Sequence, residues 1–137
     1  MTREALGPSP RSRERSESTL DLGRSGEELA ANFLRNAGLE VLSRNWRSGR
    51  RELDLVVLDG SVVDFVEVKT RRAGPQSPAE AVGRAQRRRL RGAAEAWIHA
   101  HPGVGSEFRF DVVGIVISPD RPPSVVHIAD AFTGDDC

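Results

Sequence analysis

The sequence predicts a three-layer α/β domain, in which a mixed central β-sheet is flanked by helices in the order α-β-β-β-α-β-β. Apolar residues recur at helical spacing in two segments, residues 25–37 and 79–100, on either side of three strand-like segments. The Asp59-Gly60 pair separates two apolar runs, as in a β-hairpin. Residues 108–117 are almost continuously apolar, which is typical of a central strand.

Composition limits the class of protein. The 137 residues fit one domain, with equal numbers of acidic and basic residues and a hydrophobic fraction of 38%. The longest apolar run, residues 112–117, is far shorter than the ~20 residues of a membrane span. The N-terminal segment lacks the apolar core of a secretory signal, and a single cysteine, Cys137, excludes an internal disulfide framework. We therefore expect a cytoplasmic protein with no membrane association.

The first elements follow a tail. Residues 1–20 are rich in Ser, Arg, Glu and Pro, and we expect them to be disordered. The first helix is predicted over residues 25–37, with Ser25 as N-cap, Glu28 completing a capping box and Gly38 ending it. A strand is predicted over residues 39–46. The hairpin follows, with strands over residues 52–58 and 62–69.

The second half holds one helix and two strands. Pro75 and Pro78 place a loop after the hairpin, and the second helix spans residues 79–100, in one piece or in two pieces around Gly83. The strand over residues 108–117 and a short strand over residues 125–128 complete the sheet. The domain is then residues 22–132, and residues 133–137 form a loose C-terminus.

The hairpin register gathers charged side chains. With Asp59 and Gly60 as the loop, Leu58 faces Ser61, and residues in step along both strands share one face. That face carries Glu52, Asp54, Glu67 and Lys69. Like charges opposed across strands destabilise a sheet, and a hard cation such as Mg²⁺ would remove the repulsion. The alternative is an ordinary solvated face on which Glu67 and Lys69 pair.

Two helical positions can join this cluster. Glu27 lies at the edge of the apolar stripe of the first helix, from which it can reach the sheet, or it simply suits the helix dipole. In the second helix Gln86 falls in line with Leu90 and Trp97, so an amide is predicted to point inward.

The zero net charge hides an uneven distribution. Residues 71–91 carry a net charge of +6 and residues 92–137 a net charge of −5. The cations are 19 arginines and a single lysine, Lys69, which offers a compact charge that arginine does not. The basic segment is either a solvated helix face or a phosphate-binding surface. Its candidate nucleic-acid-binding residues are Arg71, Arg72, Arg84, Arg87, Arg88 and Arg91.

Several motifs in order resemble the YraN family of small bacterial proteins with an endonuclease-like fold. They are Gly23-x-x-Gly26-Glu27-x-x-Ala30, Asn45-Trp46-Arg47, Glu52-Leu53-Asp54-Leu55, Phe65-Val66-Glu67-Val68-Lys69-Thr70-Arg71, Arg109-Phe110-Asp111-Val112 and Ala131-Phe132. Through that family the chain resembles the PD-(D/E)XK nucleases, including archaeal Holliday-junction resolvases. Two positions depart from the family pattern, because Arg51 stands where glycine is usual and Gln86 where lysine is usual.

The resemblance implies a restriction-endonuclease-like core and a metal-dependent phosphodiesterase that acts on nucleic acid. The implied catalytic residues are Glu27, Asp54, Glu67 and Lys69, and the implied Mg²⁺ or Mn²⁺ ligands are Asp54, Glu67 and the Val68 carbonyl. Glu52, Gln86 and Asp111 are the implied supporting residues. DNA, including branched DNA, is the expected partner, and a homodimer is left open. The alternative is a module of the same fold that binds nucleic acid without cutting it.

Overall fold

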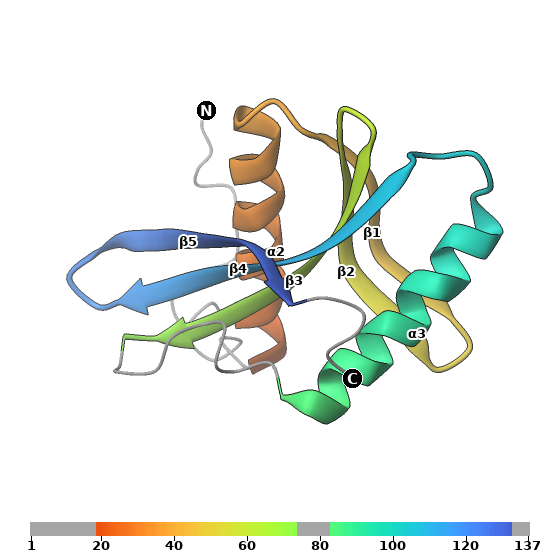
Figure 1. The fold of residues 1–137 in the computed structure, drawn as a ribbon. Helices are drawn as coiled ribbons and strands as arrows, with labels where there is room; N and C mark the ends of the chain where they lie inside the picture. The colour runs from red at the N-terminus through yellow and green to blue at the C-terminus, as the bar shows by residue number, and fades with distance from the viewer. Residues whose placement is uncertain (1–18, 74–82, 133–137) are drawn as a thin grey trace, which may run out of the picture.

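The computed structural model describes residues 19–73 and 83–132, which form a five-stranded sheet between two helices (Figure 1). Strand order follows the chain, and only β3 and β4 run parallel, so the sheet is mixed. This architecture confirms the predicted fold class and element order. The elements are α2 (Thr19–Asn36), β1 (Glu40–Ser48), β2 (Arg51–Asp59), β3 (Val62–Arg72), α3 (Arg84–Ala100), β4 (Glu107–Ser118) and β5 (Arg121–Phe132).

Each face of the sheet carries its own hydrophobic core. On the α3 side, Trp97 packs with Phe65 and the ring centroids lie 5.8 Å apart. On the α2 side, Leu34 packs with Leu55 and Ile115. Because side chains alternate along a strand, a polar residue on β3 or β4 is committed to one of these two faces. The two helices therefore define two separate environments on one sheet.

α2 begins at Thr19, six residues before its predicted start. Ser25 is thus an exposed residue inside the helix, and Glu28 bonds to Arg44 at 2.8 Å, so the predicted capping box is wrong. A glycine inside a helix costs only about 1 kcal/mol, so Gly23 and Gly26 do not end it. No helix in the described ranges is long and apolar enough to cross a bilayer.

The hairpin register differs from the predicted one. Leu58 lies opposite Val63 and Asp59 opposite Val62, so the loop residues are Gly60 and Ser61. Gly60 has φ 63°, which suits the first central position of a type II′ turn, where glycine is preferred. The partner of each residue moves by two positions. An even shift keeps the side chains of the paired residues 55–59 and 62–66 on their predicted faces. Beyond the ladder the alternation of β2 breaks, because Leu53 and Leu55 pack on opposite faces of the sheet.

β5 and α3 also differ in length from the prediction. β5 spans twelve residues instead of four, and its Pro122 and Pro123 are tolerated because it is an edge strand next to a register shift with β4. α3 begins at Arg84 with Gly83 as N-cap. The predicted tail up to residue 18, the helical segment 79–82 and the C-terminus from residue 133 lie outside the described residues.

Candidate functional site

Asp54 and Glu67 meet where β2 and β3 separate. The ladder between these strands runs from Asp59–Val62 to Leu55–Val66 and then stops. One residue further along β2, Asp54 accepts a hydrogen bond from the Val68 N–H, with 2.9 Å between N and Oδ2. The strand ends thus open a gap that a carboxylate occupies, in place of another backbone pair.

The two carboxyl groups compete for one proton. Burial and the charge of Asp54 raise the pKa of Glu67 to about 8. Burial also raises the pKa of Asp54, although the Val68 N–H acts in the opposite direction. A hydrogen bond between the two side chains lowers the pKa of Asp54 and raises that of Glu67. Glu67 is therefore the member of the pair that holds a proton.

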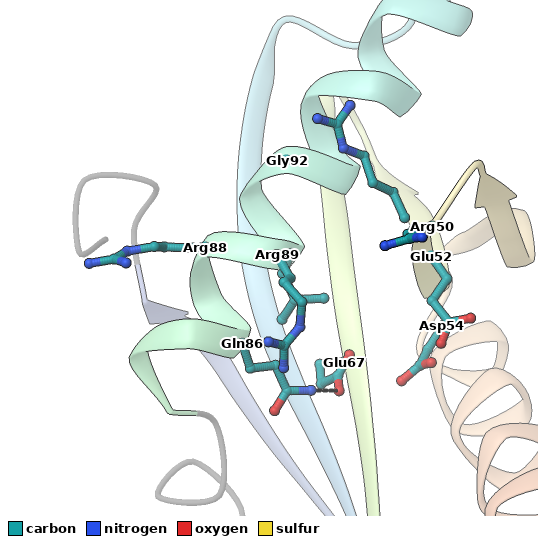
Figure 2. A pocket seen from close by; sticks show the side chains of 10 residues that line it. Arg50, Glu52, Asp54, Glu67, Gln86, Arg88, Arg89 and Gly92 are labelled. Carbon is teal, nitrogen blue, oxygen red and sulfur yellow. Dashed lines mark hydrogen bonds between the residues drawn. The ribbon is translucent and has the colours of Figure 1, made fainter.

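Lys69 and Gln86 complete the cluster, and Figure 2 shows Gln86 bonded to Glu67. The Gln86 amide donates to Glu67 Oε2 at 2.6 Å and accepts from Lys69 Nζ at 3.1 Å. Lys69 Nζ also lies 3.4 Å from Glu67 Oε2. Gln86 therefore points inward from α3, as its helical phase predicted, and holds both the carboxylate and the ammonium group.

Glu27 approaches the pair from α2. Burial and the nearby charge of Asp54 raise its pKa, while a hydrogen bond from the Asn45 side chain lowers it. Asn45 has φ 49°, a left-handed conformation that asparagine tolerates better than most residues. A Cβ at Gly26 would collide with the Thr70 side chain, so a glycine there lets α2 lie close to β3. The structure thus brings Glu27 to the site.

A pocket of about 540 Å³ opens from these carboxylates beneath α3. Glu52 and Leu90 line it together with four arginines, which are Arg50, Arg51, Arg88 and Arg89. Figure 2 shows Arg89 extending in the direction of Gln86, whereas Arg88 points away from the carboxylates. Arg51 lies along α3 at Gly92, with 3.5 Å from its Nε to an ideal Cβ there. The arginine at this unusual family position therefore forms a wall of the pocket.

The predicted basic surface is only partly at the pocket. Of the six arginines inferred from the sequence, Arg88 lines it, and Arg91 instead pairs with Glu95 at 3.6 Å on the exposed side of α3. Glu52 pairs with Arg47 at 3.2 Å while it lines the pocket. The remaining candidates are exposed or half-buried elsewhere on β3 and α3: Arg71, Arg72, Arg84 and Arg87.

Asp111 does not belong to this site, so its predicted supporting role is wrong. Phe110 and Val112 point into the core beneath α3, and strand alternation therefore turns Asp111 to the α2 side. There it contacts Arg109 and His127 and lies beside Asp64. This second cluster was not predicted from the sequence, although Asp64 stands between two buried apolar residues of β3 and faces the opposite side from Glu67.

Comparison with known proteins supports the resemblance drawn from the motifs. Residues 26–115 match the model of "Uncharacterised protein family UPF0102". The chain is similar to the UPF0102 protein of Nocardia farcinica, with 46% identity over 112 residues, which cover 81% of this chain and 88% of the relative. It is also similar to the UPF0102 protein of Rhodococcus opacus, with 46% identity over 114 residues, which cover 82% of this chain and 97% of the relative.

Proposed function

The chain belongs to the family described as uncharacterised protein family UPF0102, and from its site we propose a metal-dependent phosphodiesterase that acts on nucleic acid, preferably DNA. One observation carries the proposal. The buried Glu67, the half-buried Asp54 and the single lysine of the chain meet at the point where β2 and β3 separate, beside an arginine-lined pocket. A hydrolytic site for a phosphate diester needs this combination of anionic ligands and cationic groups.

The donor set fits a hard divalent cation. The side chains of Asp54 and Glu67 are joined by a hydrogen bond, and oxygen ligands of this kind are those that Mg²⁺ and Mn²⁺ prefer. Asp54 and Glu67 would hold the ion, with the Val68 carbonyl as a third ligand. When bound, such an ion supplies Lewis-acid activation of a phosphate oxygen or a water.

Lys69 and Gln86 supply the remaining polar chemistry at the site. The Lys69 ammonium group is held between Gln86 and Glu67, so it is positioned to stabilise negative charge that develops on a phosphate group or to orient an attacking water. Gln86 fixes both partners through one amide. Glu27, whose pKa is raised by burial and by the charge of Asp54, would act from α2 through a water.

The arginines of the pocket would bind the nucleic-acid backbone. Arg88 is exposed at the pocket and Arg89 extends along α3 toward Gln86 (Figure 2), so a phosphate chain could contact both. Arginine binds phosphate oxygens in a bidentate manner and carries no preference for base sequence by that contact. We therefore propose that the protein recognises the backbone and the shape of the nucleic acid and not its base sequence.

A binding module without cleavage is the second candidate, and one observation favours it. Glu67 already accepts a hydrogen bond from Gln86 at 2.6 Å, so this carboxylate is partly satisfied without a cation. If that hydrogen bond persists in the presence of Mg²⁺ or Mn²⁺, the pocket would bind phosphate groups and leave them intact.

The first prediction tests cleavage directly. The purified full chain is incubated with Mg²⁺ or Mn²⁺ and with branched, duplex and single-stranded DNA and the matching RNAs. We expect cleavage of at least one substrate, and Asp54→Asn, Glu67→Gln and Lys69→Ala should each reduce it about 100-fold or more, because each removes part of one unit. Glu28→Gln is the matched control, because Glu28 pairs with Arg44 outside the pocket.

Two results would decide against the enzyme. Cleavage that persists unchanged in Lys69→Ala would identify a contaminating nuclease. Tight binding of the same substrates with no cleavage under either metal would favour the binding module.

A further inference from the structure

A second cluster of ionisable groups lies on the α2 side of the sheet, across three neighbouring strands. Asp64 comes from β3, Arg109 and Asp111 from β4, and His127 from β5. Both aspartates are completely buried. Arg109 donates to Asp64 Oδ2 at 3.0 Å and to Asp111 Oδ1 at 3.1 Å, and His127 Nε2 lies 2.7 Å from Asp111 Oδ2.

One atom of this cluster lacks a donor. Asp64 Oδ1 is buried and receives no hydrogen bond from any of the described residues. An unsatisfied buried carboxylate oxygen costs free energy, so a native structure that keeps one calls for an unseen partner such as an ion. This oxygen is the first sign that the cluster is incomplete.

The charges give the second sign. Two buried carboxylates face one permanent cation, Arg109, and His127 beside Asp111 adds a positive charge only when it is protonated. A bound cation would supply the balancing charge and would also satisfy the orphaned oxygen.

We propose that Asp64, Asp111 and His127 bind a divalent transition-metal ion of the Zn²⁺ class. Each residue offers one ligand atom, and these atoms all lie within 4.8 Å of one another. One imidazole nitrogen with two carboxylate oxygens is a donor set that suits zinc and its neighbours better than Mg²⁺. This site is on the opposite face of the sheet from Asp54 and Glu67, so it does not depend on the proposed function.

Arg109 does not block the ion, because a second partner is available to it. Its Nη2 lies 3.7 Å from Asp59 Oδ2, and the Asp59 side chain is half exposed. As an ion binds Asp64, Arg109 can keep Asp59 and remain paired. The side chains of Arg109 and His127 are each 25% exposed, so the cluster reaches solvent past them. The Phe33 ring packs edge-on against His127 and helps to orient it.

The test is a titration of the full chain with Zn²⁺ by calorimetry, and with Co²⁺ by visible absorption, in a Cys137→Ser background that removes the thiol. Asp64→Asn and His127→Gln are the site variants. Asparagine mimics the protonated Asp64, and glutamine keeps a donor toward Asp111, so both variants should fold. Asp54→Asn is the matched control on the other face, and unfolding by circular dichroism checks each protein.

We expect Zn²⁺ to bind and Co²⁺ to give the absorption bands of an imidazole–carboxylate site. Affinity should fall at least tenfold in Asp64→Asn and in His127→Gln and stay within twofold in Asp54→Asn. Equal binding by His127→Gln, or no binding by the folded parent protein, would overturn the proposal. Either failure leaves the Mg²⁺-dependent cleavage experiment unaffected, because that experiment uses the other pair of carboxylates.

Discussion

Each face of the sheet carries a pair of carboxyl groups in close contact, and the two pairs differ in their surroundings. On the α3 side, the half-buried Asp54 and the buried Glu67 form a carboxylate pair, and on the α2 side the fully buried Asp64 and Asp111 form another. In both pairs burial raises the pKa of one member far above its ordinary value, to about 8 for Glu67 and about 9 for Asp64.

The two pairs differ in their cation and in their access to solvent. The α3-side pair is served by Lys69, a compact point charge, and it opens into a pocket of about 540 Å³. The α2-side pair is bridged by the guanidinium of Arg109, which contacts both aspartates. A rigid bidentate bridge suits a structural network, whereas a single ammonium beside an open pocket suits chemistry on a bound group. The two clusters therefore have similar charges and are distinguished by the geometry of the cation and by access to solvent.

Exchanging the two cations gives the largest expected effects. Lys69→Arg should abolish most cleavage and change stability little, because a guanidinium does not fit between Gln86 and Glu67 as the ammonium does. Arg109→Lys should cost about 1.5–3 kcal/mol of unfolding free energy, because one ammonium cannot bond to both aspartates and leaves a buried carboxylate without its charged donor.

Chemical denaturation and the cleavage assay measure the two outcomes on the same protein preparations. An Arg109→Lys protein as stable as the parent would show that the bidentate bridge contributes nothing to the fold. A fully active Lys69→Arg protein would remove the special role of the lysine.

The sequence predicted the first cluster much better than the second. Strand alternation is insensitive to an even error in register, so Glu67 and Lys69 were placed on one face although the turn was assigned to the wrong residues. Asp54 meets them just beyond the end of the ladder, where the alternation of β2 breaks between Leu53 and Leu55. Helical periodicity correctly placed Gln86 on the inward face of α3, because that prediction does not depend on strand register. The contribution of Glu27 needed more than periodicity, because it depends on the close approach of α2 at Gly26.

The second cluster joins residues from three strands, and its recognition requires the strand order and the register between β3, β4 and β5. Asp64 and Arg109 are partners only because β3 and β4 are parallel neighbours. The sequence also did not predict that Arg50, in the β1–β2 turn, and Arg51, at the start of β2, line the pocket. Pairing between distant segments is a tertiary property that local pattern does not contain.

The pH dependence of stability gives a smaller effect that distinguishes the two pairs. Between pH 4.5 and about 8 for Glu67, and between pH 3.8 and about 9 for Asp64, the folded protein keeps a proton that the unfolded chain releases. Stability from these groups is therefore complete at low pH and is lost as pH rises through those windows. Thermal melts in EDTA should show the melting temperature falling from pH 6 to pH 9.

The two neutral variants separate the contributions. Glu67→Gln should flatten the fall below about pH 8, and Asp64→Asn should also flatten the part between pH 8 and 9, where only Asp64 still titrates. A parent protein whose melting temperature rises from pH 6 to pH 9 would contradict the raised pKa values of both pairs.

The smallest expected effect concerns the exposed arginines of the two helices, of which Arg88 and Arg89 on α3 line the pocket and Arg35 on α2 does not. If Arg88 and Arg89 contact phosphates, the affinity for duplex DNA should fall with salt, with a log–log slope of about −0.9 for each contact. Replacing both with glutamine should make the slope shallower by about 1.8. Arg35→Gln is the matched control, because Arg35 is exposed on α2, where it bonds to Asn32 at 3.4 Å. Fluorescence anisotropy at several salt concentrations measures the three slopes. An equal change in the slope for Arg35→Gln would mean that DNA affinity depends on the net charge of the protein. It would contradict a specific contact between the α3 pocket and the DNA backbone.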